Sequence, residues 1–251
     1  MPIHPGIGVI IPTYNEVNNL RPLVEEILAL TICGGHPGLG DTYVIVVDDN
    51  SPDGTGDEAD ALEAMYPGRV EALHRPGKLG LGGAHLAGFA RALHLGAQIV
   101  ITMDADFSHH PRYVPAILEK GRDADVVIGS RYVPGGGVSG WPWDRRVLSR
   151  AANLLARFAT GVRVRDATTG FRLYRREVLE SIPLDNMFSS GYSFMVEMLF
   201  LVQERGWRVA ELPIILQDRR FGASKISHLE IAKAVHTLLR LGLRRVLRRS
   251  T

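Results

Sequence analysis

Short apolar runs alternate with amphipathic segments along the first half of the chain. Apolar runs typical of buried strands occupy residues 7–11, 44–47, 70–73, 98–103 and 126–129. Apolar side chains at helical spacing occupy residues 18–30, 55–66, 81–95 and 111–120. Asn18 is expected to cap the first of these helices, and Pro111 is expected to open the last.

This alternation predicts an α/β fold with a mostly parallel sheet that is flanked by helices on both faces. In such sheets, ligands bind beyond the carboxyl ends of the strands. Asp49, Asp104 and Asp106 each follow a predicted strand, so we expect their side chains to lie along one edge of the sheet.

Two segments of the second half are both basic and amphipathic. Arginines interleave with apolar side chains in residues 141–160, and residues 226–251 repeat this pattern. The stripe of the last segment comprises Leu229, Ala232, Leu239, Leu243 and Val246, and its cations are Arg240, Arg244, Arg245, Arg248 and Arg249. Such helices either lie on an anionic membrane surface or pack on the core with cations near the C-terminal dipole. We expect one domain over residues 1–225, which includes the first basic segment, and a basic amphipathic helix over residues 226–251.

Composition narrows the class of protein. The chain has 45% hydrophobic and 22% charged residues, which is typical of a globular domain rather than of a disordered chain. Cys33 is the single cysteine, which excludes an internal disulfide and indicates a reducing compartment. The sequence has no secretory pattern at the N-terminus and no apolar run of the roughly 20 residues that span a bilayer. We expect a soluble or peripheral protein without a nucleic-acid partner.

Two acidic motifs follow predicted strands. Asp104 and Asp106 come after the run at residues 98–103, and alternate residues of an extended strand point to the same side. The two carboxylates can therefore converge on Mg²⁺ or Mn²⁺, although solvated turn carboxylates are the alternative. A second acidic cluster at residues 48–55 follows another strand, and together the two motifs indicate a nucleotide-sugar site.

Other motifs allow more than one interpretation. Residues 12–16 suit a loop that holds a base or ribose, but a turn before the first helix also explains them. The glycine-rich residues 77–83 lack the ending of a phosphate loop and indicate helix entry or close backbone approach. His109 and His110 are adjacent, so their side chains diverge and suit a metal poorly. Arg131 suits either a phosphate or an ordinary surface position.

Taken together, the motifs resemble those of the dolichyl-phosphate mannose synthases, which are inverting glycosyltransferases with the GT-A fold. The motifs occupy residues 12–16, 48–55, 77–82, 104–111, 129–132 and 169–172. The resemblance extends from the first strand to Lys225, and it implies a nucleotide-binding sheet followed by amphipathic helices at a membrane surface.

The resemblance implies roles for individual residues. Donor binding would involve Pro12, Tyr14, Glu16, Val47, Asp49, Asp104, Ala105, Asp106, Arg131, Arg219 and Lys225. The metal ligands would be Asp106, Asp104 and Ser108, and the acceptor-phosphate residues would be Arg131, Arg145 and Ser149. Asp106, Arg131 and Lys225 would be the catalytic residues, and Arg219 and Lys225 belong to a loop that closes over the donor.

The implied reaction transfers mannose from GDP-mannose to a polyprenyl (dolichyl) phosphate with inversion and uses Mg²⁺ or Mn²⁺. The implied location is the cytoplasmic face of a membrane, reached through the basic helices or a membrane-anchoring partner protein. Two alternatives stay open: a polyprenyl-phosphate glucosyltransferase that uses a UDP-sugar, and a non-catalytic nucleotide-binding scaffold subunit. Glu197 is not expected to act as a base, because an acceptor phosphate is largely a dianion at neutral pH.

Overall fold

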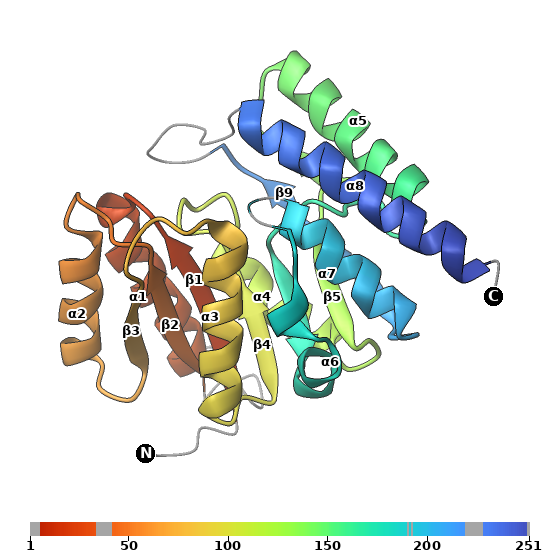
Figure 1. Cartoon of the computed structure of the whole chain (residues 1–251). Coiled ribbons are helices and arrows are strands. Elements are labelled where there is room, and N and C mark those ends of the chain that lie inside the picture. Colours follow the sequence, from red (N-terminus) through yellow and green to blue (C-terminus); the bar gives the residue numbers. More distant parts are fainter. Residues whose placement is uncertain (1–5, 34–41, 190, 192, 219–227, 250–251) are drawn as a thin grey trace.

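The computed structural model of the chain describes residues 6–33, 42–189, 191, 193–218 and 228–249 (Figure 1). The strands are β1 (Ile7–Thr13), β2 (Thr42–Asp48), β3 (Val70–His74), β4 (Ile99–Thr102), β5 (Val126–Ser130), β6 (Gly137–Val138), β7 (Arg172–Arg175), β8 (Val209–Pro213) and β9 (Ile215–Leu216). The helices are α1 (Val17–Cys33), α2 (Thr55–Met65), α3 (Leu81–His94), α4 (Val114–Lys120), α5 (Trp143–Thr160), α6 (Arg176–Ser181), α7 (Ser193–Glu204) and α8 (His228–Arg249). Two short 3-10 turns are η2 (Pro111–Tyr113) and η3 (Leu184–Asn186).

Seven strands form one sheet in the order β3-β2-β1-β4-β7-β5-β8. Neighbouring strands run parallel, except that β7 is antiparallel to both β4 and β5. This topology confirms the predicted α/β fold with a mostly parallel sheet. The apolar pattern does not predict β7, because this four-residue strand begins and ends with arginine.

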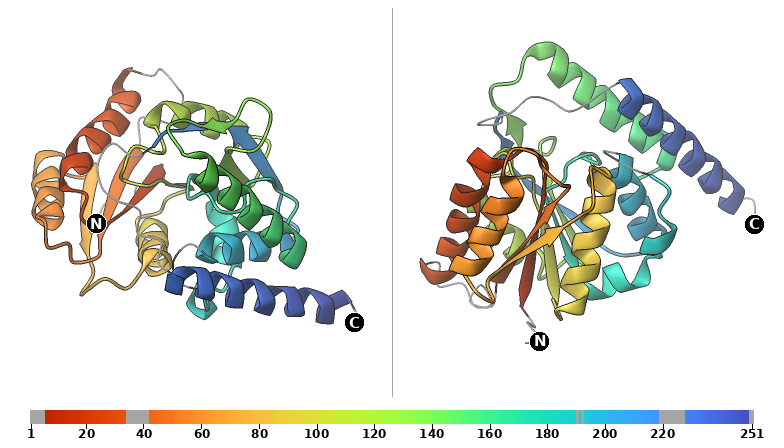
Figure 2. Two further views of the ribbon diagram at one scale, coloured as in Figure 1. Left: turned by 90° about the horizontal axis from the view of Figure 1, so that it is seen from above. Right: turned by 60° about the vertical axis from the view of Figure 1, so that its left-hand side comes forward.

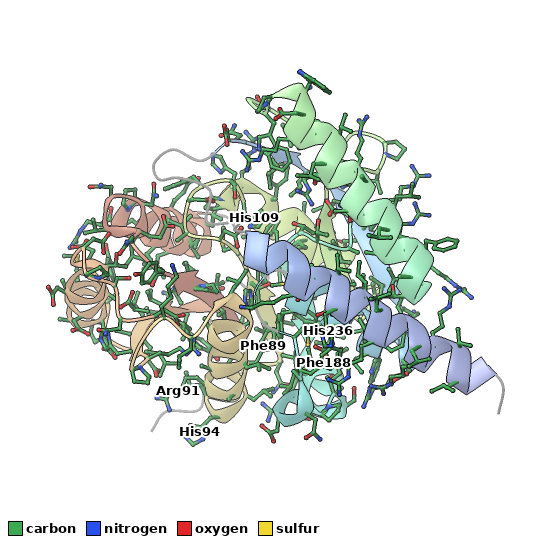
Figure 3. The ribbon with its side chains drawn as sticks, turned by 45° about the horizontal axis from the view of Figure 1, so that its top comes forward. Phe89, Arg91, His94, His109, Phe188 and His236 are labelled. Atoms are coloured by element: carbon green, nitrogen blue, oxygen red, sulfur yellow. The ribbon has the colours of Figure 1, made fainter. Side chains whose placement is uncertain are left out.

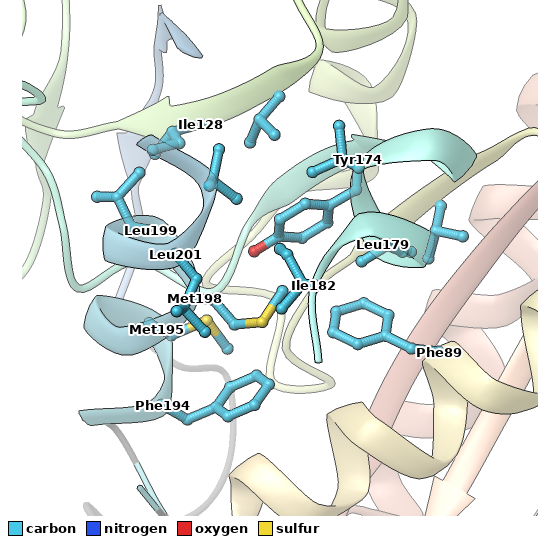
Figure 4. Packing of buried hydrophobic residues seen from close by; sticks show 14 of the residues in the cluster. Phe89, Ile128, Tyr174, Leu179, Ile182, Phe194, Met195, Met198, Leu199 and Leu201 are labelled. Atoms are coloured by element: carbon cyan, nitrogen blue, oxygen red, sulfur yellow. The ribbon is translucent and has the colours of Figure 1, made fainter. Parts of the chain in front are cut away.

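The side chains of the strands alternate between two apolar cores, one on each face of the sheet. Ile10 lies in the core that α3 and α7 cover, whereas Val9 and Ile11 lie in the core that α1, α2 and α4 cover. Figure 4 shows the first core, where the rings of Phe89 and Phe194 have centroids 6.5 Å apart. Burial on both faces explains why the strands appear in the sequence as continuous apolar runs.

The first helix starts differently from the prediction. It begins at Val17, so Asn18 lies inside the first turn, and the expected Asn18 cap is wrong. The N–H of Val17 instead donates to the Asp53 carboxylate at 3.3 Å, and the carbonyl of Glu16 accepts from the N–H of Asn19 at 2.9 Å. A side chain from the loop after β2 therefore replaces the local cap.

The glycine-rich segment leads directly into α3, which begins at Leu81. A β-carbon on Gly82 would lie 3.1 Å from the side chain of Phe194 on α7. Close packing of the two helices therefore favours glycine here, which confirms the interpretation of residues 77–83 as a helix entry with close approach.

Helices α5 and α8 pack side by side at one end of the molecule (Figures 1 and 2). Their backbones approach closely, because a β-carbon on Gly242 would lie 3.2 Å from the carbonyl oxygen of Ala159. Leu238 and Leu241 of α8 are buried in the core that α7 shares, whereas Leu239 and Leu243 are exposed. Within the described ranges, no helix is both long enough and apolar enough to cross a membrane.

Candidate active site

The parallel strands β1, β2, β4 and β5 end at one edge of the sheet, and polar residues follow each of them. Pro12 and Val47 lie side by side in register at the ends of β1 and β2. The turn that contains Asp104 and Asp106 follows β4, and Arg131 follows β5 directly. The structure therefore brings the described donor-binding candidates to the edge where α/β sheets bind ligands.

The loop after β1 is tied to the loop after β2. The N–H of Glu16 donates to Oγ1 of Thr55 at 2.9 Å, and this contact holds the start of α1 against the start of α2. The ring of Tyr14 lies under Lys78, whose Nζ is 4.1 Å from the ring centroid. An aromatic face and a cation therefore meet at the rim of the edge.

Asp49 is engaged by the glycine-rich segment. Its carboxylate forms an ion pair with Arg75 and accepts hydrogen bonds from the N–H groups of Leu79 and Gly80, both at 3.1 Å. Asp49 is only 4% exposed, so its charge is largely used within the protein. Arg75 was missed by sequence reasoning, because its partner lies 26 positions away, after a different strand.

The acidic motif does not have the geometry that the sequence suggested. Strand β4 ends at Thr102, so Asp104 and Asp106 lie in a turn, and the argument from alternation along a strand is wrong. The turn is shaped by Phe107, whose φ of 61° is left-handed. Asp106 is buried, and its Oδ1 accepts a hydrogen bond from the N–H of Ser108 at 3.0 Å. The side chain of Asp104 is 36% exposed.

His109 orients the acidic turn from inside the protein. It is 2% exposed and stacks on Phe171 with ring centroids 5.5 Å apart, and Figure 3 shows it within the body of the molecule. Its Nδ1 accepts a hydrogen bond from the N–H of Asp104 at 3.0 Å, which leaves the ring proton on Nε2. His110 lies 3.2 Å from the carboxylate of Glu26, so the two imidazoles diverge as expected.

The residues of the acidic turn fit a divalent metal only together with a ligand. Among the described residues, no group of three histidine, cysteine or acidic side chains is arranged to hold a metal. Asp104 and Asp106 supply hard carboxylate oxygens, and Mg²⁺ is commonly held by one or two carboxylates plus substrate phosphates. A β-carbon on Gly170 would lie 3.1 Å from Oδ1 of Asp104, so glycine keeps space for that carboxylate.

Arg131 is held by a carboxylate that sequence reasoning missed. Its Nε and Nη2 donate to the two oxygens of Asp166, both at 2.7 Å, and Asp166 is fully buried. Burial lowers the pKa of Arg131, but the hydrogen bonds and charge of Asp166 outweigh it and raise the pKa above its ordinary value. For Asp166, burial alone would raise the pKa of the carboxyl group. The hydrogen bonds and charge of the Arg131 guanidinium outweigh this effect, and the pKa of Asp166 is lowered. Both groups therefore stay charged.

The three predicted acceptor-phosphate residues gather around two aromatic rings. The guanidinium carbons of Arg131 and Arg145 lie 5.6 Å and 3.9 Å from the ring centroid of Trp141. Oγ of Ser149 accepts a hydrogen bond from the hydroxyl of Tyr132 at 2.7 Å. The structure therefore brings Arg131, which follows β5, close to Arg145 and Ser149 of α5.

Asn153 connects α5 to the segment that carries Asp166. Its Nδ2 donates to the carbonyl of Ser149 at 3.0 Å and to Oγ1 of Thr168 at 3.1 Å, and its Oδ1 accepts from the N–H of Ala167 at 2.7 Å. Thr168 in turn accepts from Nη2 of Arg131 at 2.7 Å. The sequence signal was an asparagine on the packed face of an amphipathic helix, and it was overlooked.

Two further predictions concern residues near the site. Arg219 and Lys225 lie outside the described residues, so their predicted role stays a prediction. Glu197 is buried and accepts hydrogen bonds from the main-chain N–H of Ser189 at 2.9 Å and from the hydroxyl of that residue. It fixes the segment before α7, and the expectation that it does not act as a base stays a prediction.

Comparison with known proteins places the chain in a family. The family model described as glycosyl transferase family 2 matches residues 8–182. The chain belongs to glycosyltransferase family 2. This family 2 chain is 44% identical over 237 residues to polyprenol monophosphomannose synthase of Mycolicibacterium smegmatis, covering 94% of the chain and 86% of that protein. It is also 44% identical to undecaprenyl-phosphate mannosyltransferase of Micrococcus luteus, covering 93% of each.

Solved structures show the same fold at lower identity. Glucosyl-3-phosphoglycerate synthase of Mycobacterium tuberculosis, solved with Mn²⁺ and UDP, matches with a TM-score of 0.64 at 24% identity, covering 94% of this chain and 79% of that one. Mannosyl-3-phosphoglycerate synthase of Rubrobacter xylanophilus matches with a TM-score of 0.68 at 18% identity, covering 98% and 75%. The family 2 chain therefore has the GT-A fold.

Proposed function

We propose that this chain transfers mannose from GDP-mannose to polyprenyl phosphate with inversion, which yields polyprenyl-phosphate β-mannose and GDP. The two relatives at 44% identity carry names that state a polyprenyl-phosphate acceptor and a mannosyl group. The guanosine base of the donor rests on the resemblance to dolichyl-phosphate mannose synthases.

The observation that carries the proposal is the meeting of two oppositely charged clusters at one sheet edge. The acidic turn with Asp104 and Asp106 suits the donor diphosphate together with a metal. Arg131 and Arg145, beside Trp141, suit the acceptor phosphate because guanidinium groups donate charge-assisted hydrogen bonds to phosphate oxygens. Asp104 lies near enough for its charge to act on the guanidinium of Arg131.

The proposed reaction is a direct displacement. A phosphate monoester has a second pKa near 6, so the acceptor attacks largely as a dianion and needs no base. An acceptor oxygen forms a bond to the anomeric carbon while the bond from that carbon to the diphosphate oxygen breaks, and the electron pair leaves with GDP. Attack from the face opposite the leaving group inverts the anomeric centre.

The residues of this chain position two anions during that step. Arg131 and Arg145 would hold the acceptor phosphate, with Ser149 next to them, and the fixed guanidinium of Arg131 directs the attacking oxygen. Asp106 and Asp104, with Ser108, would hold Mg²⁺ or Mn²⁺, which neutralises charge on the leaving diphosphate. Tyr14, Lys78 and the ends of β1 and β2 would bind the nucleoside, and Arg219 and Lys225 would close over the donor.

We further propose that the chain lies on the cytoplasmic face of a membrane. Of the 14 large hydrophobic side chains that are exposed among the described residues, 11 belong to α5 and α8. They are Trp143, Val147, Leu148, Leu154, Leu155, Phe158, Val235, Leu239, Leu243, Val246 and Leu247. Exposed apolar side chains on two neighbouring helices, with arginines beside them, are typical of interfacial helices. Binding of this surface to a membrane would place the acceptor-phosphate site, which lies within residues 1–225, next to the lipid.

The test is transfer of radiolabel from GDP-mannose to an organic-extractable product, with polyprenyl phosphate and Mg²⁺ or Mn²⁺ present. UDP-glucose is run in parallel as donor, and the anomeric configuration of the product is determined by NMR. We expect label only from GDP-mannose and a β-linked product. Label from UDP-glucose would establish the glucosyltransferase instead, and retention of configuration would contradict direct displacement.

Variants separate catalysis from scaffolding. Asp106→Ala should abolish transfer, whereas Asp57→Ala, which removes an exposed carboxylate on α2, should not. Arg145→Gln should raise KM for polyprenyl phosphate and leave KM for GDP-mannose unchanged, and Arg163→Gln, which removes an exposed arginine just after the same helix, is the control. Full membrane function of Asp106→Ala without transfer would favour the scaffold.

A further inference from the structure

A hollow of about 700 Å³ lies between α5 and the loop that follows β5. It is lined by residues of the loop 131–136, by Arg165, and by Arg150, Asn153, Leu154 and Arg157 of α5. This volume falls within the roughly 300–1,000 Å³ of small-molecule sites. Arg131 of the proposed acceptor site lines the hollow, whereas Arg145 and Ser149 do not, so the hollow adjoins the acceptor site and extends beyond it along α5.

The hollow is strongly cationic. Arg131 is paired with Asp166, but Arg150, Arg157 and Arg165 have no ion-pair partner in the part of the chain that the structure describes. No carboxylate is present among the residues that line the hollow. Three neighbouring guanidinium groups without an acidic partner repel one another, and a bound anion would offset this repulsion. Their paired N–H donors match phosphate oxygens.

The position of the hollow on α5 indicates where that phosphate comes from. Arg150 and Arg157 are seven residues apart and lie on one flank of the helix. This flank separates the packed face, where Asn153 is buried, from the apolar face, where Trp143 is 77% and Phe158 is 85% exposed. When the apolar face of an interfacial helix enters the acyl region, the flank beside it lies at the level of the lipid headgroups.

We propose that Arg150, Arg157 and Arg165 bind the phosphate of an anionic membrane phospholipid that is neither substrate nor product. The proposal rests on the membrane-surface location in the proposed function and adds a defined headgroup site to it. Occupation of the hollow fixes the rotation of α5 on the bilayer. On the same helix, Ser149 hydrogen-bonds Tyr132, and Asn153 hydrogen-bonds Thr168, which also binds Arg131. The rotation of α5 therefore also sets how the acceptor site faces the lipid.

The experiment measures binding of the full chain to vesicles, without donor and without polyprenyl phosphate. Vesicles of phosphatidylcholine are compared with vesicles that also contain phosphatidylglycerol. The variant Arg150→Gln/Arg157→Gln is compared with Arg163→Gln/Arg240→Gln, which removes the same charge from exposed arginines that do not line the hollow. Thermal unfolding and nucleotide binding verify that both variants are folded.

We expect the wild-type chain to prefer the phosphatidylglycerol vesicles. Loss of two charges near the surface should weaken binding about 30-fold in either variant at low salt, and the hollow variant should lose about 10-fold more, because it also loses charge-assisted hydrogen bonds to the headgroup phosphate. At higher salt the loss of the control variant should shrink, because diffuse surface attraction is screened. Equal weakening of the two variants would overturn the site, since only the total charge would then matter. In a separate arm, both variants are added to neutral vesicles that carry polyprenyl phosphate. If the hollow variant lost binding to these vesicles but still bound phosphatidylglycerol vesicles as the wild-type chain does, the hollow would belong to the acceptor and the proposal would be overturned.

A second arm separates a lipid headgroup from free phosphate. Inorganic phosphate and glycerol phosphate are titrated into the wild-type chain without vesicles. Tight, saturable binding of inorganic phosphate without any preference for phosphatidylglycerol vesicles would overturn the lipid as the ligand. Failure here leaves the radiolabel transfer assay untouched, and failure of mannose transfer leaves vesicle binding measurable, so the two proposals are tested independently.

Discussion

The guanidinium of Arg131 and the carboxylate of Asp166 form a two-pronged ion pair, in which Asp166 is 0% and Arg131 is 8% exposed. A buried pair gains little net stability, because taking both charges out of water costs about as much as their attraction returns. The pair fixes the direction of Arg131, which is the property that a phosphate-binding cation at this edge requires.

Asp166→Asn should therefore lower the free energy of unfolding by about 3–5 kcal/mol, because it leaves a buried cation without its counter-charge. The double variant Arg131→Gln/Asp166→Asn should lose clearly less than the sum of the single losses. Urea denaturation measures all three. Glu119→Gln, which breaks the exposed pair with Arg122, is the control and should cost less than about 1 kcal/mol. Additive losses would show that the two side chains are not coupled.

Asn153 should act as a positioning residue. Asn153→Asp keeps the acceptor for the N–H of Ala167 but removes the donors to Ser149 and Thr168, whereas Asn153→Leu removes all three hydrogen bonds. We expect the free energy of unfolding to fall by about 1–3 kcal/mol in the leucine variant, and to fall in the aspartate variant as well, because a buried carboxylate oxygen would then face the carbonyl of Ser149. KM for polyprenyl phosphate should rise in both, with KM for GDP-mannose unchanged. Steady-state kinetics with each substrate varied separately would contradict this role if the two constants rose together.

Gly170→Ala should disturb the acidic turn. The added β-carbon would lie 3.1 Å from Oδ1 of Asp104, so the carboxylate must shift by a few tenths of an ångström. A change in the residues that orient a metal ligand typically lowers metal affinity by about 10-fold or more. Titration of transfer activity with Mn²⁺ should show a higher half-saturating concentration, with the maximal rate largely recovered at high metal. An unchanged Mn²⁺ requirement would argue that Asp104 does not contact the metal.

Stability should depend on pH through His85. Burial lowers the pKa of this α3 side chain from 6.5 to about 4, and its Nδ1 donates to the carbonyl of Leu81 at 2.9 Å. The unfolded chain takes up a proton below pH 6.5, whereas the folded chain does so only near pH 4. The stability from neutral His85 is therefore complete above pH 6.5 and is lost between pH 6.5 and 4, by about 3 kcal/mol in total.

His85→Leu should remove this part of the acid sensitivity. Urea denaturation at neutral pH and near pH 4 should show a smaller difference for the variant than for the wild-type chain. His94→Leu is the control, because His94 is exposed at the outer end of the same helix (Figure 3). The same pH slope in His85→Leu and wild type would mean that another group causes the acid sensitivity.

The sequence predicted the elements that depend on local pattern. The strands up to β5 and the helices between them follow from apolar runs and helical spacing, and the position of Asp49 and Asp104 follows from the rule for strand ends. The pairing of Arg131 with Asp166 could not be predicted, because it joins positions 35 residues apart through the fold. Strand β7 was missed because Arg172 is buried among carbonyl groups, including those of Ala167 and Met195, which no periodicity indicates.

The reversed strand β7 also sets a distance. It lies between β4 and β5, and neighbouring strands are about 4.8 Å apart, so the ends of β4 and β5 are separated by roughly 10 Å. The acidic turn stands at one of these ends and Arg131 at the other. Had β4 paired directly with β5, the acidic turn and Arg131 would stand about 4.8 Å closer together. One inserted strand thus sets the spacing between the carboxylates proposed to hold the donor and the cation proposed to hold the acceptor.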